Sequence, residues 1–333
     1  MSATEFWLRW RRDIVRGAFL FALVVVVGWG GISLSRSMVQ RGKESLTQLG
    51  GSLGNGFDGD FLANDRRRAE PWTYTAPLRA GLTLWLRNIN GSITVDSAAG
   101  GRVEIRAERT ARHSDPASVR LVAVGSPQGL TVCALWRDGD RCGAGGHFES
   151  GGPDKASDAA AVFTVLLPRG VRFDASTVHG DITVSDAAGP VGVGTVMGDL
   201  DVETSGGPVR AATVNGDVQV TIHGFREPGD VNLATVHGDV ELDLPDQVDA
   251  EVEGNTVTGD ISSDFPLTVS GEFASHSVTG RLGKGGRRVH LTAVAGDLEV
   301  RRAEADAAPV TPREAAPGSS RPRRGTSSRR SAS

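Results

Sequence analysis

The stretch Ala234–Leu242, ATVHGDVEL, contains a motif that the chain repeats. Close copies read GTVMGDLDV, ATVNGDVQV and STVHGDITV, and NINGSITV near residue 90 follows the same pattern. The valine before x-Gly recurs at steps of 18, 18, 22, 21, 21 and 16 residues, at Val178, Val196, Val214, Val236, Val257, Val278 and Val294. A short apolar motif with such a period is typical of a solenoid in which each repeat forms one coil.

Two further apolar columns keep a fixed offset from these valines. Five residues upstream lie Phe173, Val191, Val209, Val231, Val252, Phe273 and Val289, and three upstream lie Ala175, Val193, Ala211, Leu233, Gly254, Ser275 and Leu291. The offsets hold although the step length changes, and the extra residues of the longest step, Phe225–Pro228, fall between strands. We therefore expect all three columns to point into one core, with the valines as the core ladder, in coils stacked about 4.8 Å apart.

The glycine and the aspartate of the motif predict corners. A glycine can adopt a positive φ where the wall of the solenoid bends. The predicted turn glycines are Gly91, Gly180, Gly198, Gly216, Gly238, Gly259, Gly280 and Gly296. The following aspartate faces outward in this interpretation and accepts local backbone N–H bonds. Stacked carboxylates also leave open a Ca²⁺ ladder, but the copies INGSI and VTGRL lack the aspartate.

These patterns predict an all-β chain folded as a single-stranded right-handed parallel β-helix. An antiparallel sandwich is the competing architecture, because regular turn spacing also fits it. The stretch Val95–Pro168 does not carry the repeat and is expected to cap the N-terminal end of the solenoid. The segment GGRRVHLTAVAGDLEV, which ends at Val300, is expected to close the other end.

A membrane segment precedes the β region. Between Arg16 and Arg36 lie 19 residues without a charge, which as a helix would span about 28 Å, close to the hydrocarbon core of a bilayer. This length favours an uncleaved signal anchor, although Ser33 and Ser35 leave a cleavage site open. The flanking charges give a slight bias toward a cytoplasmic N-terminus. The expected segments are a basic cytoplasmic tail (1–16), the anchor (17–35), a flexible tether (36–71), an N-terminal β region (72–170), the solenoid (171–300) and a disordered basic tail (301–333).

The two cysteines, Cys133 and Cys142, are nine positions apart across a Gly-Asp turn. This spacing suits a disulfide that closes a hairpin-like loop and contributes roughly 2.5–3 kcal/mol. Two unrelated buried thiols are the alternative, and a zinc site is disfavoured because no other ligands cluster there. Because disulfides persist in oxidising compartments, the pair and the anchor together place the bulk of the chain in the periplasm or outside the cell.

At these residues the chain resembles the putative adhesin family of bacterial β-strand-repeat proteins of unknown function, and the related head GIN domain of putative auto-transporter adhesins. The motifs that carry the resemblance are NINGSITV, STVHGDITV, ATVNGDVQV and ATVHGDVEL, with VLLPRGVRFDAST leading into the repeats. The resemblance covers roughly Pro77 to Val300. It implies a single-chain β-helix at the cell envelope and brings no catalytic residues.

The sequence favours a non-catalytic, membrane-anchored protein that binds, scaffolds or senses envelope components. The net charge of −4 does not indicate a nucleic-acid partner, and no catalytic, cofactor or metal residues are predicted. His179 and His237 share one outward slot but lie too far apart for a shared metal, and GPVGVG starts no helix that could bind phosphate. The alternatives are a polysaccharide-active lyase or hydrolase, for which pairs such as Asp199 and Asp201 would supply the carboxylates, and a self-assembling envelope polymer.

Overall fold

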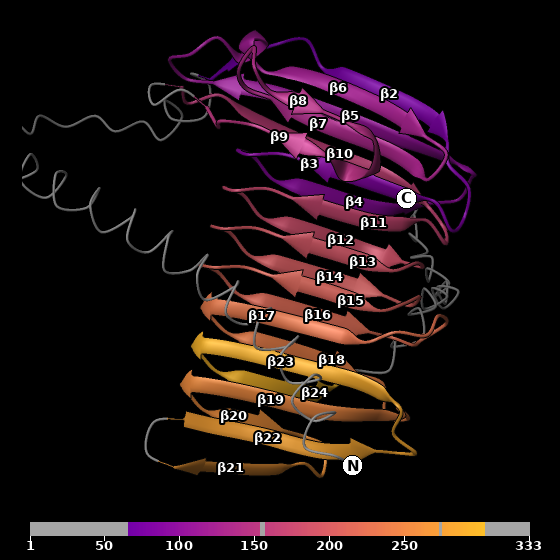
Figure 1. Cartoon of the computed structure of the whole chain (residues 1–333), viewed down its shortest axis with the longest axis vertical. Coiled ribbons are helices and arrows are strands. Elements are labelled where there is room, and N and C mark those ends of the chain that lie inside the picture. The colour runs from indigo at the N-terminus through magenta and orange to yellow at the C-terminus, as the bar shows by residue number, and fades with distance from the viewer. Residues whose placement is uncertain (1–65, 154–156, 273–274, 304–333) are drawn as a thin grey trace, which may run out of the picture. The chain divides into compact units, whose positions relative to one another are not determined.

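The computed structural model describes residues 66–153, 157–272 and 275–303 (Figure 1). This part of the chain contains 24 strands and two short 3₁₀ helices, η1 (Pro116–Ser118) and η2 (Ala144–Gly146), so the all-β prediction is confirmed. The predicted anchor, most of the tether and most of the C-terminal tail lie outside the described residues. Within those residues, no helix has the length and apolarity needed to cross a membrane.

Two long sheets face each other across the core. Sheet A has the order β1-β5-β10-β4-β12-β14-β16-β18-β24-β20, with β2 also paired to β5. Its strands are β1 (Arg67–Arg68), β2 (Trp72–Pro77), β4 (Ile93–Ala98), β5 (Arg102–Ala111), β10 (Ala160–Pro168), β12 (Ile182–Ala187), β14 (Leu200–Thr204), β16 (Val218–Ile222), β18 (Val240–Leu244), β20 (Ile261–Ser263) and β24 (Leu298–Arg302).

Sheet B has the order β21-β22-β19-β23-β17-β15-β13-β11-β3-β7-β6. Its strands are β3 (Thr83–Arg87), β6 (Arg120–Ser126), β7 (Gly129–Leu135), β11 (Arg172–Ser176), β13 (Val191–Gly194), β15 (Val209–Ala212), β17 (Val231–His237), β19 (Ala250–Thr258), β21 (Thr268–Glu272), β22 (Ser275–Leu282) and β23 (Arg287–Ala295). A third, small sheet pairs β8 (Arg141–Cys142) with β9 (Phe148–Glu149).

Each repeat forms one coil, with its first strand in sheet B and its second in sheet A. Successive coils pair in parallel and in register, so that Phe173 lies beside Val191 and Val191 beside Val209. The buried members of the two upstream columns are Phe173, Val191, Val209, Val231, Val252 and Val289, and Ala175, Val193, Ala211, Leu233 and Leu291. Both columns are therefore confirmed as core ladders over these residues. The coils form a β-solenoid-like fold, and its right-handed winding stays a prediction.

The third predicted ladder is wrong at the corners. The valine before x-Gly is half-buried at Val178, Val196, Val214 and Val236, and it is exposed at Val257 (53%) and Val294 (42%). Val278 is buried, but it lies in the antiparallel strand β22 and not at a corner. The preceding residue points inward instead, at the buried Thr177, Thr195, Thr213, Thr235 and Thr256. In β13 the odd-numbered side chains, those of Val191 and Val193, point inward. This alternation continues to Thr195 before the chain bends.

The coils do not stack in the order of the sequence. The last coil, β23–β24, lies between coil β17–β18 and coil β19–β20, where Figure 1 shows the yellow strands. Strand β23 pairs in parallel with β17 on one side and with β19 on the other. The expectation that the segment ending at Val300 closes the stack is therefore wrong.

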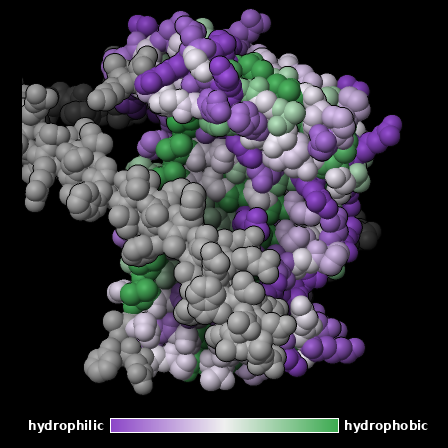
Figure 2. Space-filling model, in the orientation of Figure 1, coloured by the Kyte–Doolittle hydropathy of each residue, from purple (hydrophilic) through white to green (hydrophobic). Residues whose placement is uncertain are grey.

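Antiparallel strands close the N-terminal end of the stack and the distal end of sheet B, whereas sheet A ends distally on β20, which pairs in parallel with β24. At the N-terminal end, β5 pairs antiparallel with β10 and β6 with β7, as expected for a cap built from Val95–Pro168. At the other end, β22 pairs antiparallel with β19 and β21 with β22. In Figure 2, hydrophilic side chains dominate the visible surface at the end that holds β2, β5 and β6. The antiparallel strands interrupt the repeat and cover the parallel edge of the coils where they pair with it. Among the described residues, no strand pairs with the outer edge of β20.

Candidate binding face

The repeated corner is a structural joint between coils. Its threonine hydroxyl donates to the carbonyl of the motif glycine in the neighbouring coil, as from Thr195 to Gly180 (3.1 Å) and from Thr235 to Gly216 (2.9 Å). Its aspartate accepts the backbone N–H of the next aspartate in the column, as Asp217 Oδ1 does from Asp239 (2.8 Å). The spatial order of this column is Asp181, Asp199, Asp217, Asp239, Asp297, Asp260. The sequence suggested that the aspartate accepts a bond from its local backbone. In the structure it accepts the N–H of the neighbouring coil instead.

Steric contact between the coils explains why this joint requires glycine. A Cβ at Gly238 would lie 2.1 Å from the carbonyl oxygen of Gly216, and the residue has a φ of +140°. The other corner glycines with positive φ are Gly91, Gly180, Gly198, Gly216, Gly259 and Gly296. Gly280 does not belong to this set: it lies inside β22, paired with Val252, so the prediction of a turn there is wrong. The stack needs glycine wherever two corners touch through their backbones.

The other charged candidates of the repeats remain on the surface. Asp199 is part of the corner column, so its carboxylate already serves a structural bond. His179 and His237 occupy equivalent exposed positions, with Met197 and Asn215 between them in the stack. Among the described residues no group of three or more His, Cys, Asp or Glu side chains is arranged to hold a metal ion.

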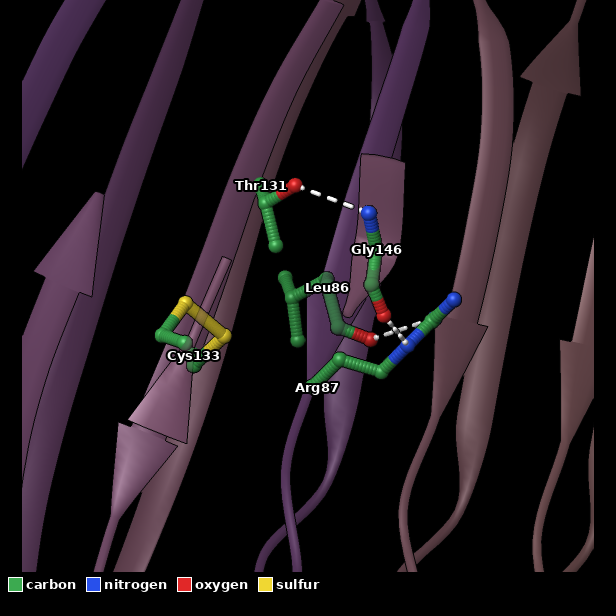
Figure 3. Close-up of a disulfide and its surroundings, with 6 residues drawn as sticks. Leu86, Arg87, Thr131, Cys133 and Gly146 are labelled. Atoms are coloured by element: carbon green, nitrogen blue, oxygen red, sulfur yellow. Dashed lines mark hydrogen bonds between the residues drawn. A yellow bond between two sulfur atoms is a disulfide. The ribbon is translucent and has the colours of Figure 1, made fainter. Parts of the chain in front are cut away.

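The disulfide Cys133–Cys142 forms, with its Cα atoms 6.0 Å apart, and it shapes the loop that follows β7. Figure 3 shows how this loop brings Gly146 over β3: the Gly146 N–H donates to Thr131 (3.0 Å), and Arg87 donates to the Gly146 carbonyl (3.2 Å). Arg87 also pairs with Asp174 at 2.6 Å. The loop therefore holds the outer surface of β3 against β11.

Asp140 fixes the same loop from inside. Its carboxylate accepts from the N–H groups of Trp136 (2.7 Å) and Gly151 (3.1 Å) and from the Ser150 hydroxyl (2.7 Å). Burial opposes ionisation here, but the hydrogen bonds from Ser150 and from the backbone together lower the pKa of Asp140. The charged form is thus the one that the loop requires.

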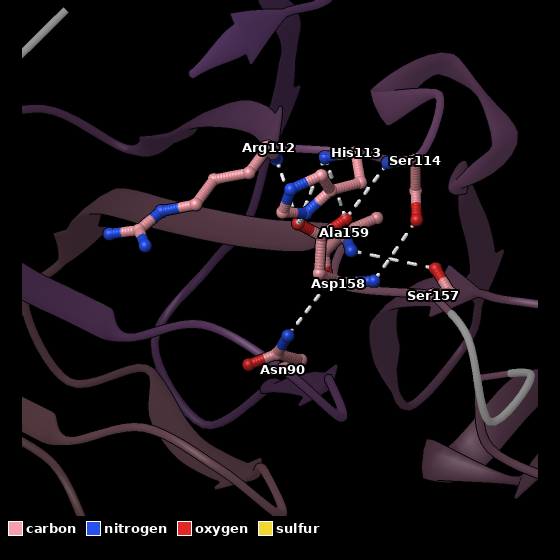
Figure 4. Close-up of polar contacts among 7 residues, drawn as sticks. All are labelled: Asn90, Arg112, His113, Ser114, Ser157, Asp158 and Ala159. Atoms are coloured by element: carbon pink, nitrogen blue, oxygen red, sulfur yellow. Dashed lines mark hydrogen bonds and ion pairs between the residues drawn. The ribbon is translucent and has the colours of Figure 1, made fainter. Parts of the chain in front are cut away.

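A second carboxylate, Asp158, organises the loop between β5 and η1. Figure 4 shows it facing the backbone of Arg112, His113 and Ser114, and its oxygens accept all three N–H groups at 2.9–3.3 Å. The N–H of Ser114 is the main cause that lowers the pKa of Asp158 well below its usual range. This site is a structural anchor for the N-terminal cap.

The outer face of sheet B is hollowed over β11, β13 and β15. The cleft has a volume of about 340 Å³, and glycine stands at its centre: Gly192 lies in register between Asp174 and Arg210. Trp85 from β3 is the neighbour of Asp174 on the other side and also lines the cleft. The face therefore combines a position without a side chain at Gly192, the Asp174 carboxylate beside it, an indole ring and several other charged groups.

The charges around this cleft do not balance. Asp174 pairs with Arg87 and Asp230 with Arg288 (3.1 Å), so both acids are neutralised by arginines at the rim. Arg172 and Arg210 line the cleft, are exposed, and form no ion pair within the described part of the chain. The cleft is lined by two arginines and two aspartates, and with Arg87 and Arg288, which pair with the aspartates, the group holds four arginines and two aspartates.

The outer face of sheet A is acidic instead. Its outward side chains include Asp201, Glu203, Glu241, Asp243 and Glu299. Burial, and then the charge of Glu203, raises the pKa of Asp201, and burial is the main cause that raises the pKa of Glu241 and Asp243. Arg301 binds both Glu241 and Glu299, and its hydrogen bond is the main cause that lowers the pKa of Glu299.

Comparison with known proteins relates the regular coils to a family. Residues 169–301 match the family model described as Toastrack DUF4097. This segment is therefore similar to Toastrack domains. No curated protein matches the chain.

Solved structures similar to the chain come from two bacterial groups. A "putative cell adhesion protein" from Clostridium sporogenes ATCC 15579 is 12% identical, covers 70% of this chain and 100% of its own, and has a TM-score of 0.40. A "putative adhesin" from Bacteroides fragilis NCTC 9343 is 8% identical, covers 69% and 97%, and has a TM-score of 0.28.

The cleft crosses the boundary of the matched segment. Arg172, Gly192 and Arg210 lie inside the matched residues, whereas Trp85 comes from the preceding copy of the repeat. GPVGVG starts no helix, and the outward position of Gly192 within it was not predicted. The missed signal was a glycine at an outward strand position, with a tryptophan in the matching column of the first coil.

Proposed function

We propose that the chain is a non-catalytic binding protein of the cell envelope, anchored by segment 17–35, with the Toastrack coils outside the cytoplasm. The observation that carries the binding role is the cleft around Gly192, where Arg172 and Arg210 lack ion-pair partners among the described residues. An exposed cationic group without an intramolecular partner is available to a ligand.

The location rests on two supports. The uncharged segment of 19 residues is long enough to span a bilayer, and the disulfide Cys133–Cys142 is stable only in an oxidising compartment. The tether predicted at 36–71 would separate the anchor from the β region, and the β region begins earlier than predicted, because β1 (Arg67–Arg68) pairs with β5.

A catalytic role has less support. Glycosidases need a pair of free carboxyl groups about 5–10 Å apart beside a substrate cleft. Here the acids of the cleft, Asp174 and Asp230, are engaged by arginines, and the carboxylates of sheet A are bound by Arg301 or lie on an open strand surface. End-to-end polymerisation through sheet B is also opposed by the antiparallel strands at both ends of that sheet.

The experiment compares location and envelope binding in one strain. The full chain should be found in the membrane fraction and should be cut by protease added to spheroplasts while the membrane stays closed. Isolated cell envelope should retain the detergent-solubilised chain. Arg210→Glu should weaken this retention, whereas Ala212→Glu, at the next exposed outward position of β15, should not. A protease-resistant chain, or equal retention of both variants, would refute the proposal.

A further inference from the structure

We infer that the cleft around Gly192 binds an acidic sugar residue, with its carboxylate between Arg172 and Arg210 and its ring beside Trp85. This inference rests on the proposed binding function and names the ligand class. The cleft, of about 340 Å³, falls in the lower part of the usual range for small-ligand sites, roughly 300–1,000 Å³.

The position of the two arginines suits a single anion. Arg172 is on β11 and Arg210 on β15, with only β13 between them. Arg210 shares its column with Gly192 and Asp174, and Arg172 lies two residues before Asp174. At about 4.8 Å per strand and about 3.3 Å per residue, the backbones of the two arginines are roughly 12 Å apart, a distance that two long side chains can bridge from both sides. Gly192 contributes no side chain to this space, and the Asp174 carboxylate leans toward it from β11. Guanidinium groups bind carboxylates through paired, charge-assisted hydrogen bonds, so this gap fits a carboxylate.

Trp85 supplies an apolar wall for a ring. A Cβ on Gly146 would lie 2.5 Å from the indole Cδ1, which shows that the disulfide loop packs closely against this side chain. The indole is thus held in one position, while its remaining surface lines the cleft. A rigid aromatic ring offers contact area at a low cost in conformational entropy, and the C–H face of a sugar packs on such a surface.

The hydrogen-bond acceptors of the cleft distinguish a sugar acid from a plain anion. Asp174 retains carboxylate acceptor capacity beyond its bond to Arg87, and Asn232 can both accept and donate. The Asp174 carboxylate would repel the additional oxygens of a phosphate, and both groups can accept hydrogen bonds from sugar hydroxyl groups. A polyhydroxylated ring with one carboxylate therefore suits Asp174 and Asn232 as well as the two arginines.

The chain offers a matched pair of variants for the test. Gly192→Val would fill the cleft, since a Cβ there first meets the flexible carboxylate of Asp174 at 3.2 Å. Gly194→Val adds the same side chain to the same strand, but its Cβ meets only the Ala212 carbonyl oxygen at 3.5 Å. Neither glycine has a positive φ, so both strands should tolerate valine.

The experiment measures binding of the full detergent-solubilised chain to polygalacturonate by calorimetry, with dextran as the neutral control and inorganic phosphate as competitor. We expect binding to polygalacturonate alone, a loss of at least tenfold in affinity for Gly192→Val and Arg210→Gln, and no change for Gly194→Val. Arg210→Gln keeps the test valid if Gly192→Val lowers the melting temperature, because Arg210 is exposed and has no ion-pair partner among the described residues.

Three results would overturn the inference: no binding to polygalacturonate, equal binding to dextran, or displacement by phosphate at the same concentration as by galacturonate, which would show a simple anion site. Each is distinguishable from failure of the proposed function, because membrane location and retention by isolated envelope are measured separately.

Discussion

The outer faces of sheets A and B carry opposite charge, although the same coils build both. Outward from β14, β18 and β24, sheet A presents Asp201, Glu241 and Glu299. Outward from β11 and β15, sheet B presents Arg172 and Arg210 around a cleft. The inward residues are constrained by the stack, whereas outward residues contact only their column neighbours and solvent. A solenoid can therefore keep one core and diverge independently on its two faces.

The largest effect should come from the corner that both faces share. Gly238→Ala would place a methyl group against the Gly216 carbonyl at a φ of +140° and should lower the free energy of unfolding by about 3 kcal/mol. Urea denaturation of the full chain measures this change. Gly194→Ala is the control and should change stability by less than about 1 kcal/mol, since it has room and an ordinary φ. Equal losses would argue against the corner joint.

Removing the disulfide should affect sheet B more than sheet A. The double variant Cys133→Ala, Cys142→Ala should lose about 2.5 kcal/mol from the loop constraint and should release Gly146 from Trp85. The fluorescence of Trp85 and any ligand binding to the cleft should change together. Unchanged fluorescence on reduction would show that the loop does not hold the indole.

The corner threonine should have a smaller effect. Thr235→Val keeps the shape but removes the donor to the Gly216 carbonyl, at a cost of about 1 kcal/mol. Val236→Thr, one residue later on the half-buried side, should cost less. The melting temperatures of the two variants show which of the two residues points into the core. A larger loss for Val236→Thr would support the original prediction that the valines form the core ladder.

The smallest effect concerns the charge of sheet A. Because the pKa of Asp201 is raised in the folded protein, its charged form opposes folding above that pKa, and the penalty disappears as pH falls through it. Asp201→Asn should therefore add roughly 0.5 kcal/mol or less at pH 7, since solvent screens this exposed group. The gain should vanish below about pH 4.

The contribution of Asp158 to folding stability should depend on pH in the opposite direction from that of Asp201. Its pKa is lowered in the folded protein, so its contribution is present above the unfolded value of about 3.9 and is lost as pH falls toward the folded pKa. Asp158→Asn should destabilise the protein at pH 7, and less so in acid. Two variants with the same pH dependence would contradict the contrast between the two carboxylates.

The sequence predicts the coils well because two columns, such as Val191 and Val193, keep one spacing whatever the loop length. The prediction fails at Thr195 and Val196. Either residue could be buried, and which of them points inward depends on where the chain bends. The sequence cannot order the later coils, because their corners repeat the same threonine, glycine and aspartate joint. The sequence also did not predict the cleft, because Trp85 and Gly192 are far apart in the chain and share a column only in the folded stack.

The interleaved coil β23–β24 has a consequence for synthesis. As the chain emerges, coil β19–β20 has no parallel neighbour until residues 287–302 arrive and join it to β17–β18. A polypeptide that stops before Arg287 would leave coil β17–β18 and coil β19–β20 each without the parallel neighbour β23–β24. The last strands to be made thus join the distal cap to the rest, and unfinished copies are the ones most exposed to quality-control proteases.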